Sequence, residues 1–210
     1  MDGLAAPVQG GVAPNGVAAG RVMSLLGLFG YLLGAALYAI VAAVIVSLGR
    51  AAWTGQRVPP AFVVLVLATG FVIFMGLHPF PSPGSVECKR VLLDPRGVAE
   101  PYMRLWRNGA PLSAWLGNLG IVSVPANFVF FMGVGAALAF NAQSLRTAFL
   151  FGVGVSGFIE VSQLTGLWGV YSCAYRHFET ADLLLNVGGV VAGFALVRAW
   201  RGKRLASPAR

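Results

Sequence analysis

The chain carries a small set of polar residues inside long apolar segments, where charged and amide side chains are uncommon. Glu160 and Gln163 are three residues apart and share one face of a helix. Asp182 and Asn186 are four apart and share a face in the same way, and Arg176 lies between the two pairs. An ionisable group in a membrane-spanning segment costs about 2.5–3.5 kcal/mol on insertion scales, so it faces the protein interior and usually marks function.

These residue types can bind and orient the polar part of a ligand. Arg176 is suited to a phosphate or a carboxylate. Glu160 and Asp182 are the catalytic candidates, and Glu160 is the candidate general base if a reaction takes place. The sequence predicts no metal site and no cofactor. The ligand-binding candidates are Asn127, Gln163, Arg176 and Asn186.

Each of these residues also has a structural explanation. Asp182 can stabilise the positive N-terminal end of its helix, with Thr180 as the N-cap. Glu160 can be the buried ion-pair partner of Arg176. The two asparagines can form hydrogen bonds between helices, worth about 0.6 kcal/mol on average. The residues alone leave both explanations open.

The elements that hold these residues are predicted to be membrane helices. Hydrophobic residues make up 57% of the 210 residues and charged residues 10%, and the mean hydropathy is +0.76. Soluble domains average about 25% charged residues, so most of this chain cannot cover itself with a water-compatible surface. The sequence predicts an all-α polytopic membrane protein, a bundle of about five transmembrane helices of about 20 residues each.

The apolar runs divide the chain into segments. Residues 1–20 are predicted to be a disordered tail, 21–80 two transmembrane helices, 81–117 an extramembrane loop, 118–200 a three-helix core and 201–210 a basic tail. Within the loop, Tyr102 and Trp106 are expected either to anchor an interfacial helix or to lie in an ordinary surface loop. The expected helices are 22–48, 61–77, 119–140, 147–167 and 181–200.

The charge pattern favours a lipid partner and an orientation. The net charge of +8 comes from basic residues between or after the apolar runs, which indicates anionic lipid headgroups and excludes nucleic acid as the partner. The basic cluster from Arg198 to Arg204 favours a cytoplasmic C-terminus in a multi-pass cell-membrane protein. Cys88 and Cys173 then lie in external loops, either as a disulfide or as two free thiols.

Helix direction predicts that the polar residues meet. Asn127 lies in the first part of its helix, Glu160 and Gln163 in the last turns of theirs, and Asp182 in the first turns of the next. Alternating helices bring these ends to one side, so the six polar groups are expected to converge in one half of the membrane, toward the external face.

Three segments together resemble the VanZ-like family. They are Asn127-Phe-Val-Phe-Phe131-Met-Gly133-Val-Gly135, Glu160-x-x-Gln163, and Arg176-His-Phe178-Glu-Thr-Ala-Asp182-Leu-Leu-Leu-Asn186-x-x-Gly189-x-x-x-Gly193. The resemblance covers about residues 119–200. One departure is Gly133, where the family usually has proline. Glu179 stands where the family often has a second acid.

The resemblance implies a family named for a teicoplanin-resistance accessory protein, with no established reaction. We therefore expect a protein that binds or modifies a cell-envelope lipid, a lipid-linked cell-wall precursor or a glycopeptide-related ligand, with a role in antibiotic resistance. Two other functions fit the residues. One is a structural or partner-binding membrane protein, and the other is a proton-coupled transporter, against which no internal repeat is evident.

Overall fold

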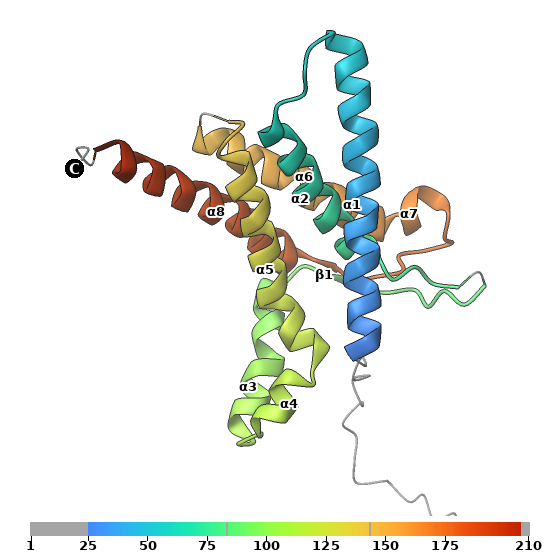
Figure 1. Ribbon diagram of the computed structural model, residues 1–210. Helices are drawn as coiled ribbons and strands as arrows, with labels where there is room; N and C mark the ends of the chain where they lie inside the picture. Colours follow the sequence, from blue (N-terminus) through green and yellow to red (C-terminus); the bar gives the residue numbers. More distant parts are fainter. Residues whose placement is uncertain (1–24, 83, 143, 207–210) are drawn as a thin grey trace, which may run out of the picture.

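The computed structural model describes residues 25–82, 84–142 and 144–206, and this part of the chain is mainly helical, with two short strands (Figure 1). The predicted all-α class is confirmed, and five helices in these ranges are long and apolar enough to cross a membrane. The tail predicted for residues 1–20 lies outside the described residues. The five helices are α1 (Leu25–Thr54), α2 (Pro60–Leu77), α5 (Leu119–Leu138), α6 (Leu145–Leu164) and α8 (Thr180–Ala206).

Three helix ends differ from the sequence prediction by three residues or more, and the first is that of α1, which continues to Thr54 rather than ending at residue 48. The last helix continues to Ala206, so the first residues of the predicted basic tail are helical. Helix α6 ends at Leu164 rather than at residue 167, because Gly166 follows with a φ of +62° and breaks the right-handed helix. A short turn, α7 (Gly166–Gly169), comes next, and its Trp168 indole Nε1 donates to Ser162 Oγ at 3.0 Å.

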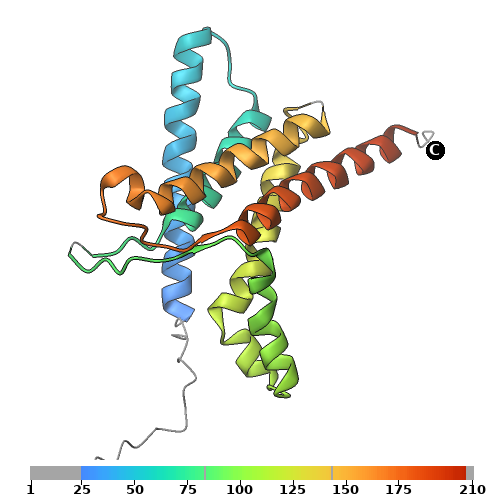
Figure 2. The same ribbon diagram turned by 180° about the vertical axis from the view of Figure 1, so that it is seen from behind.

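The centre of the bundle is the contact between α5 and α8, which lie side by side in both views (Figures 1 and 2). Glycines make this contact possible. A Cβ at Gly135 would lie 2.0 Å from the Val190 carbonyl oxygen, and one at Gly193 would lie 2.0 Å from that of Met132. Small residues let helix backbones approach closely in a membrane, where lipid offers no hydrophobic driving force. The packing around this contact buries Val134, Val190 and Phe194.

The long segment between α2 and α5 forms short elements: β1 (Val91–Leu92), a 3-10 helix η1 (Pro95–Val98), α3 (Ala99–Arg107) and α4 (Leu112–Leu116). Helices α3 and α4 lie together beside the start of α5 (Figure 1). Trp106 is exposed, which agrees with either alternative, an anchor in the headgroup region or an ordinary surface position. Tyr102 instead turns toward the protein, where its hydroxyl donates to the Ile121 carbonyl.

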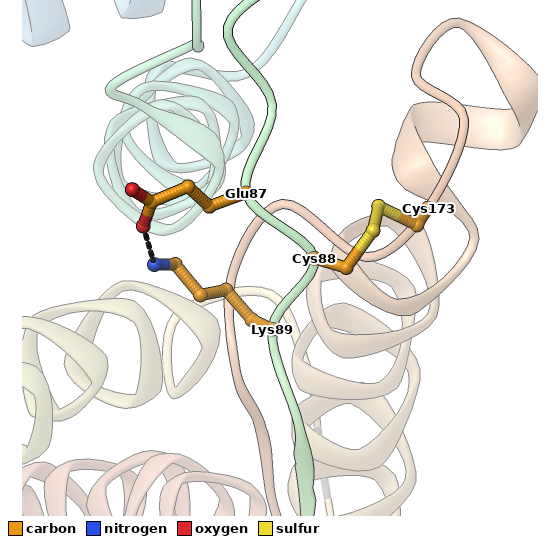
Figure 3. Close-up of a disulfide and its surroundings, with 4 residues drawn as sticks. All are labelled: Glu87, Cys88, Lys89 and Cys173. Atoms are coloured by element: carbon orange, nitrogen blue, oxygen red, sulfur yellow. Dashed lines mark hydrogen bonds and ion pairs between the residues drawn. A yellow bond between two sulfur atoms is a disulfide. The ribbon is translucent and has the colours of Figure 1, made fainter.

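The loops before α3 and after α7 are joined into one layer. Cys88 and Cys173 form a disulfide (Figure 3), a pairing that the sequence left open. Next to it, the Lys89 N–H donates to the Ala174 carbonyl at 2.8 Å. Strand β1 then pairs in parallel with β2 (Phe178–Glu179), with Leu92 opposite Glu179. This layer ends where α8 begins.

Candidate functional site

A small cavity lies among α2, α5, α6 and α8, and all six of the polar residues singled out from the sequence line it. Its volume is about 30 Å³, which is room for one or two water molecules. Apolar side chains of α2, α5 and α6 complete the lining. The six polar residues are Asn127, Glu160, Gln163, Arg176, Asp182 and Asn186.

Glu160 points into the bundle rather than toward lipid. Its residue is 2% exposed, and its Oε2 accepts the backbone N–H of Glu179 at 3.1 Å. The donor belongs to β2, so the position of this carboxylate depends on the pairing of the two loops. A second carboxylate oxygen, Oε1, has no hydrogen-bond partner in the described part of the chain.

Helix α8 contributes an acid and an amide on one face. Asn186 Nδ2 donates to Ser156 Oγ on α6 at 3.0 Å, which ties the two helices together. The other amide atom, Asn186 Oδ1, is buried without a hydrogen-bond partner. The side chain of Asp182, one turn earlier, makes no hydrogen bond to any described residue, and α8 begins at Thr180 itself. Asn127 reaches the cavity from α5, also without a described hydrogen bond.

Arg176 and Gln163 bind the C-terminal end of α2. The Gly76 carbonyl accepts from Gln163 Nε2 at 2.8 Å and from Arg176 Nη1 at 3.0 Å. Arg176 Nη1 also donates to the His78 carbonyl at 2.7 Å. The last carbonyls of a helix have no partner within it and carry a negative partial charge, so a guanidinium is a favourable ligand. Arg176 is therefore held by backbone oxygens.

Three more groups complete this end of α2. The hydroxyl of Tyr31 on α1 donates to the Met75 carbonyl at 2.7 Å, and that of Tyr175 to the Leu77 carbonyl at 2.8 Å. The His78 N–H donates to the Phe74 carbonyl at 2.9 Å. Burial raises the pKa of Tyr175 to about 12, so it remains a donor at neutral pH. Burial and the charge of Arg176 lower the pKa of His78, which keeps its imidazole neutral.

Sequence reasoning missed this role of α2. The atoms that α2 presents are backbone carbonyls and the side chains of Val72 and Met75, which look like any apolar helix in the sequence. Glu179 was noted for its side chain, but the structure uses its backbone N–H. No residue-type signal marks either contribution.

The charged groups around the cavity do not form direct ion pairs. The ion pairs within the described residues are Lys89–Glu87, Arg96–Asp94 and Arg104–Glu100, all in the segment between α2 and α5. The alternative explanation of Glu160, a buried ion pair with Arg176, is therefore not found among the described residues. Glu160 and Asp182 line a common space and have no ion-pair partner in this part of the chain. Burying a charge without a partner is costly. No three His, Cys, Asp or Glu side chains of the described residues gather as a metal-binding group.

The shared carbonyl of Gly76 gives a stability prediction. Gln163→Leu or Arg176→Met alone leaves Gly76 with one donor, whereas the double substitution leaves a partly buried carbonyl without any. We expect the double variant to lose about 1–2 kcal/mol more unfolding free energy than the sum of the single variants. Unfolding of all four proteins in one detergent measures this coupling. Gln163→Leu combined with the exposed Arg104→Met is the control, and purely additive losses in the first pair would contradict the role of Gly76.

Comparison with known proteins places the chain in a family. The family model described as VanZ/LLP1 matches residues 61–201, about two thirds of the chain. The match begins in α2 and so includes the helix end that Arg176 and Gln163 bind. None of the curated proteins and none of the solved structures matches the chain.

Proposed function

Because the chain belongs to the VanZ/LLP1 family, we propose that it binds the polar part of a cell-envelope lipid, of a lipid-linked cell-wall precursor or of a glycopeptide-related molecule at the cavity. The observation that carries this proposal is the arrangement of Glu160, Asp182 and Arg176 around one space without a direct ion pair among them. Charges buried in an apolar bundle need a partner. A polar group entering from a lipid supplies one.

The size of the cavity limits what enters. About 30 Å³ accepts the terminal atoms of a headgroup, while the acyl chains of a lipid would remain outside, against the apolar helix surfaces. If the bound molecule is also modified, Glu160 is the general base, since its Oε1 is directed to no described donor. A role in resistance to glycopeptide antibiotics follows if the bound lipid is one on which those antibiotics act.

The orientation of the site is part of the proposal. The Cys88–Cys173 disulfide supports an external position for the loops before α3 and after α7, because disulfides persist in oxidising compartments. The basic residues at the end of α8, on the opposite side of the bundle, support a cytoplasmic C-terminus. The polar cavity then opens toward the outer leaflet.

The competing function is a scaffold, and one observation favours it for two of the six residues. Arg176 and Gln163 bind the end of α2, so their loss weakens the fold whatever the site binds. The test therefore uses the carboxylates. Among the described residues, the Glu160 carboxylate accepts only the backbone N–H of Glu179 in β2, and the Asp182 carboxylate accepts no hydrogen bond, so isosteric amides there perturb packing least.

We expect Glu160→Gln and Asp182→Asn each to reduce bound lipid about tenfold, as loss of one charged hydrogen bond predicts. Native mass spectrometry of the gently extracted full chain measures the lipid that travels with it, and teicoplanin susceptibility of cells expressing each variant is the second readout. Glu100→Gln, an exposed carboxylate on α3, is the matched control. Wild-type lipid content and susceptibility in both cavity variants, at equal protein levels, would leave the scaffold as the function.

A further inference from the structure

We propose that the group bound in the cavity is a primary ammonium, held by Glu160, Asp182 and Asn186. This inference rests on the proposed function and names its ligand class. It replaces the expectation that Arg176 recognises a phosphate or a carboxylate. Three observations carry it: the hydrogen-bonding inventory of the cavity, its net charge and its size.

Three of the groups left without partners around the cavity are acceptors; the Asn127 amide also has no partner among the described residues, and the Nε and Nη2 of Arg176 donate to no described carbonyl or carboxylate. Asn186 is 3% exposed, its Nδ2 is bound to Ser156, and its Oδ1 remains buried with no partner. Glu160 Oε1 and the Asp182 carboxylate have no donor among the described residues. An ammonium carries three N–H donors and no acceptor, so each N–H can meet one of these three side chains. A phosphate, which offers acceptors, would leave them unsatisfied.

The formal charge of the lining side chains is also negative. Arg176 is the lining cation, but the carbonyls of Gly76 and His78 already hold its Nη1. Two carboxylates oppose this one guanidinium. The last turns of α2 and α6 line the cavity, through Gly76 and Gln163, and present two negative helix ends. The first turn of α8 presents one positive end, so the helix dipoles add to the preference for a cation.

The volume selects among cations. About 30 Å³ fits a group of the size of a water molecule or two. A primary ammonium on a methylene has this size. A trimethylammonium is larger and has no N–H to donate, so it satisfies neither the shape nor the acceptors.

The test presents the full chain with defined lipids. Nanodiscs containing equal amounts of phosphatidylethanolamine, phosphatidylcholine and phosphatidylglycerol supply a primary ammonium, a trimethylammonium and an anion. Native mass spectrometry of the ejected protein is expected to show phosphatidylethanolamine enriched about tenfold over phosphatidylcholine on the wild type, which corresponds to about 1.4 kcal/mol. Asp182→Asn is expected to abolish the enrichment, and Glu100→Gln to retain it.

A second arm needs no variant and separates a lipid from a free amine. Methylammonium added to the wild type is expected to displace phosphatidylethanolamine, whereas equal tetramethylammonium leaves it bound. If methylammonium stabilises the protein against unfolding in lipid-free detergent, a free amine is sufficient for binding at the cavity. Enrichment of phosphatidylglycerol that depends on Glu160 would contradict the proposal of an ammonium ligand but would still support a headgroup-binding site. Equal retention of all three lipids by the wild type and the cavity variants overturns both.

Discussion

Gly193→Ala is expected to lower the unfolding free energy by about 2–3 kcal/mol, because overfilling a tight contact costs this much. The added Cβ would lie 2.0 Å from the Met132 carbonyl oxygen and 2.8 Å from its carbon, so α5 and α8 must separate. The obstacle is backbone and has no rotamer to change. Gly135→Ala meets the Val190 carbonyl in the same way, and the double variant is expected to be less stable than either.

Gly133→Ala is the matched control on α5. Its Cβ would meet no heavy atom within 4 Å, and the residue is exposed. We expect its stability to lie within about 0.5 kcal/mol of the wild type. Thermal or denaturant unfolding of the purified chains in one detergent compares them. Similar losses at Gly133 and Gly193 would mean that the α5–α8 contact is not the close one described.

Reduction of the Cys88–Cys173 disulfide is expected to lower the unfolding free energy by about 2–4 kcal/mol. The bond joins residues separated by 85 positions, so it removes much freedom from the unfolded chain. Unfolding with and without dithiothreitol measures the loss. The Cys88→Ser/Cys173→Ser double variant should show the lower stability in both conditions. An unfolding free energy of the wild type that is the same with and without dithiothreitol would contradict the expectation.

The same cysteines report the orientation of the protein. In intact cells, a membrane-impermeant maleimide is expected to label Cys88 and Cys173 only after treatment with an impermeant reductant. The double variant without these thiols gives the background, since no other cysteine exists in the chain. Labelling that requires broken cells would place the loop layer, and the cavity with it, on the cytoplasmic side.

The helices and the six lining residues could be predicted from the sequence for one physical reason. In a long apolar segment a charged or amide side chain must turn inward, so Glu160, Gln163 and Asn186 mark both the helix face and the place where helices meet. Glycine spacing gave the second constraint, since Gly189 and Gly193 on one face require a close neighbour. Both the polar residues and the glycine spacing are local features of the sequence, so they can be recognised without the structure.

The remaining features depend on contacts without a local signal. The binding of Arg176 to Gly76 joins residues 100 positions apart through a backbone oxygen, which every residue possesses. The pairing of β1 with β2 involves two residues on each side, too few for an alternating pattern. The end of α6 depends on Gly166 having a positive φ, whereas Gly152, Gly154 and Gly157 in the same helix do not. Glycine type alone does not distinguish these positions.

The loop layer and the membrane interior share one mechanical link. From the disulfide at Cys173 the chain runs through Arg176, which grips α2, to Glu179, whose amide holds the Glu160 carboxylate. A displacement of either loop therefore shifts the Glu160 carboxylate, because only a few residues of backbone separate them. Conversely, a ligand that draws Glu160 away from that amide is expected to loosen the layer formed by the two joined loops. Exchange of the Glu179 amide proton with solvent is therefore expected to report whether its hydrogen bond to Glu160 stays closed when the cavity is occupied.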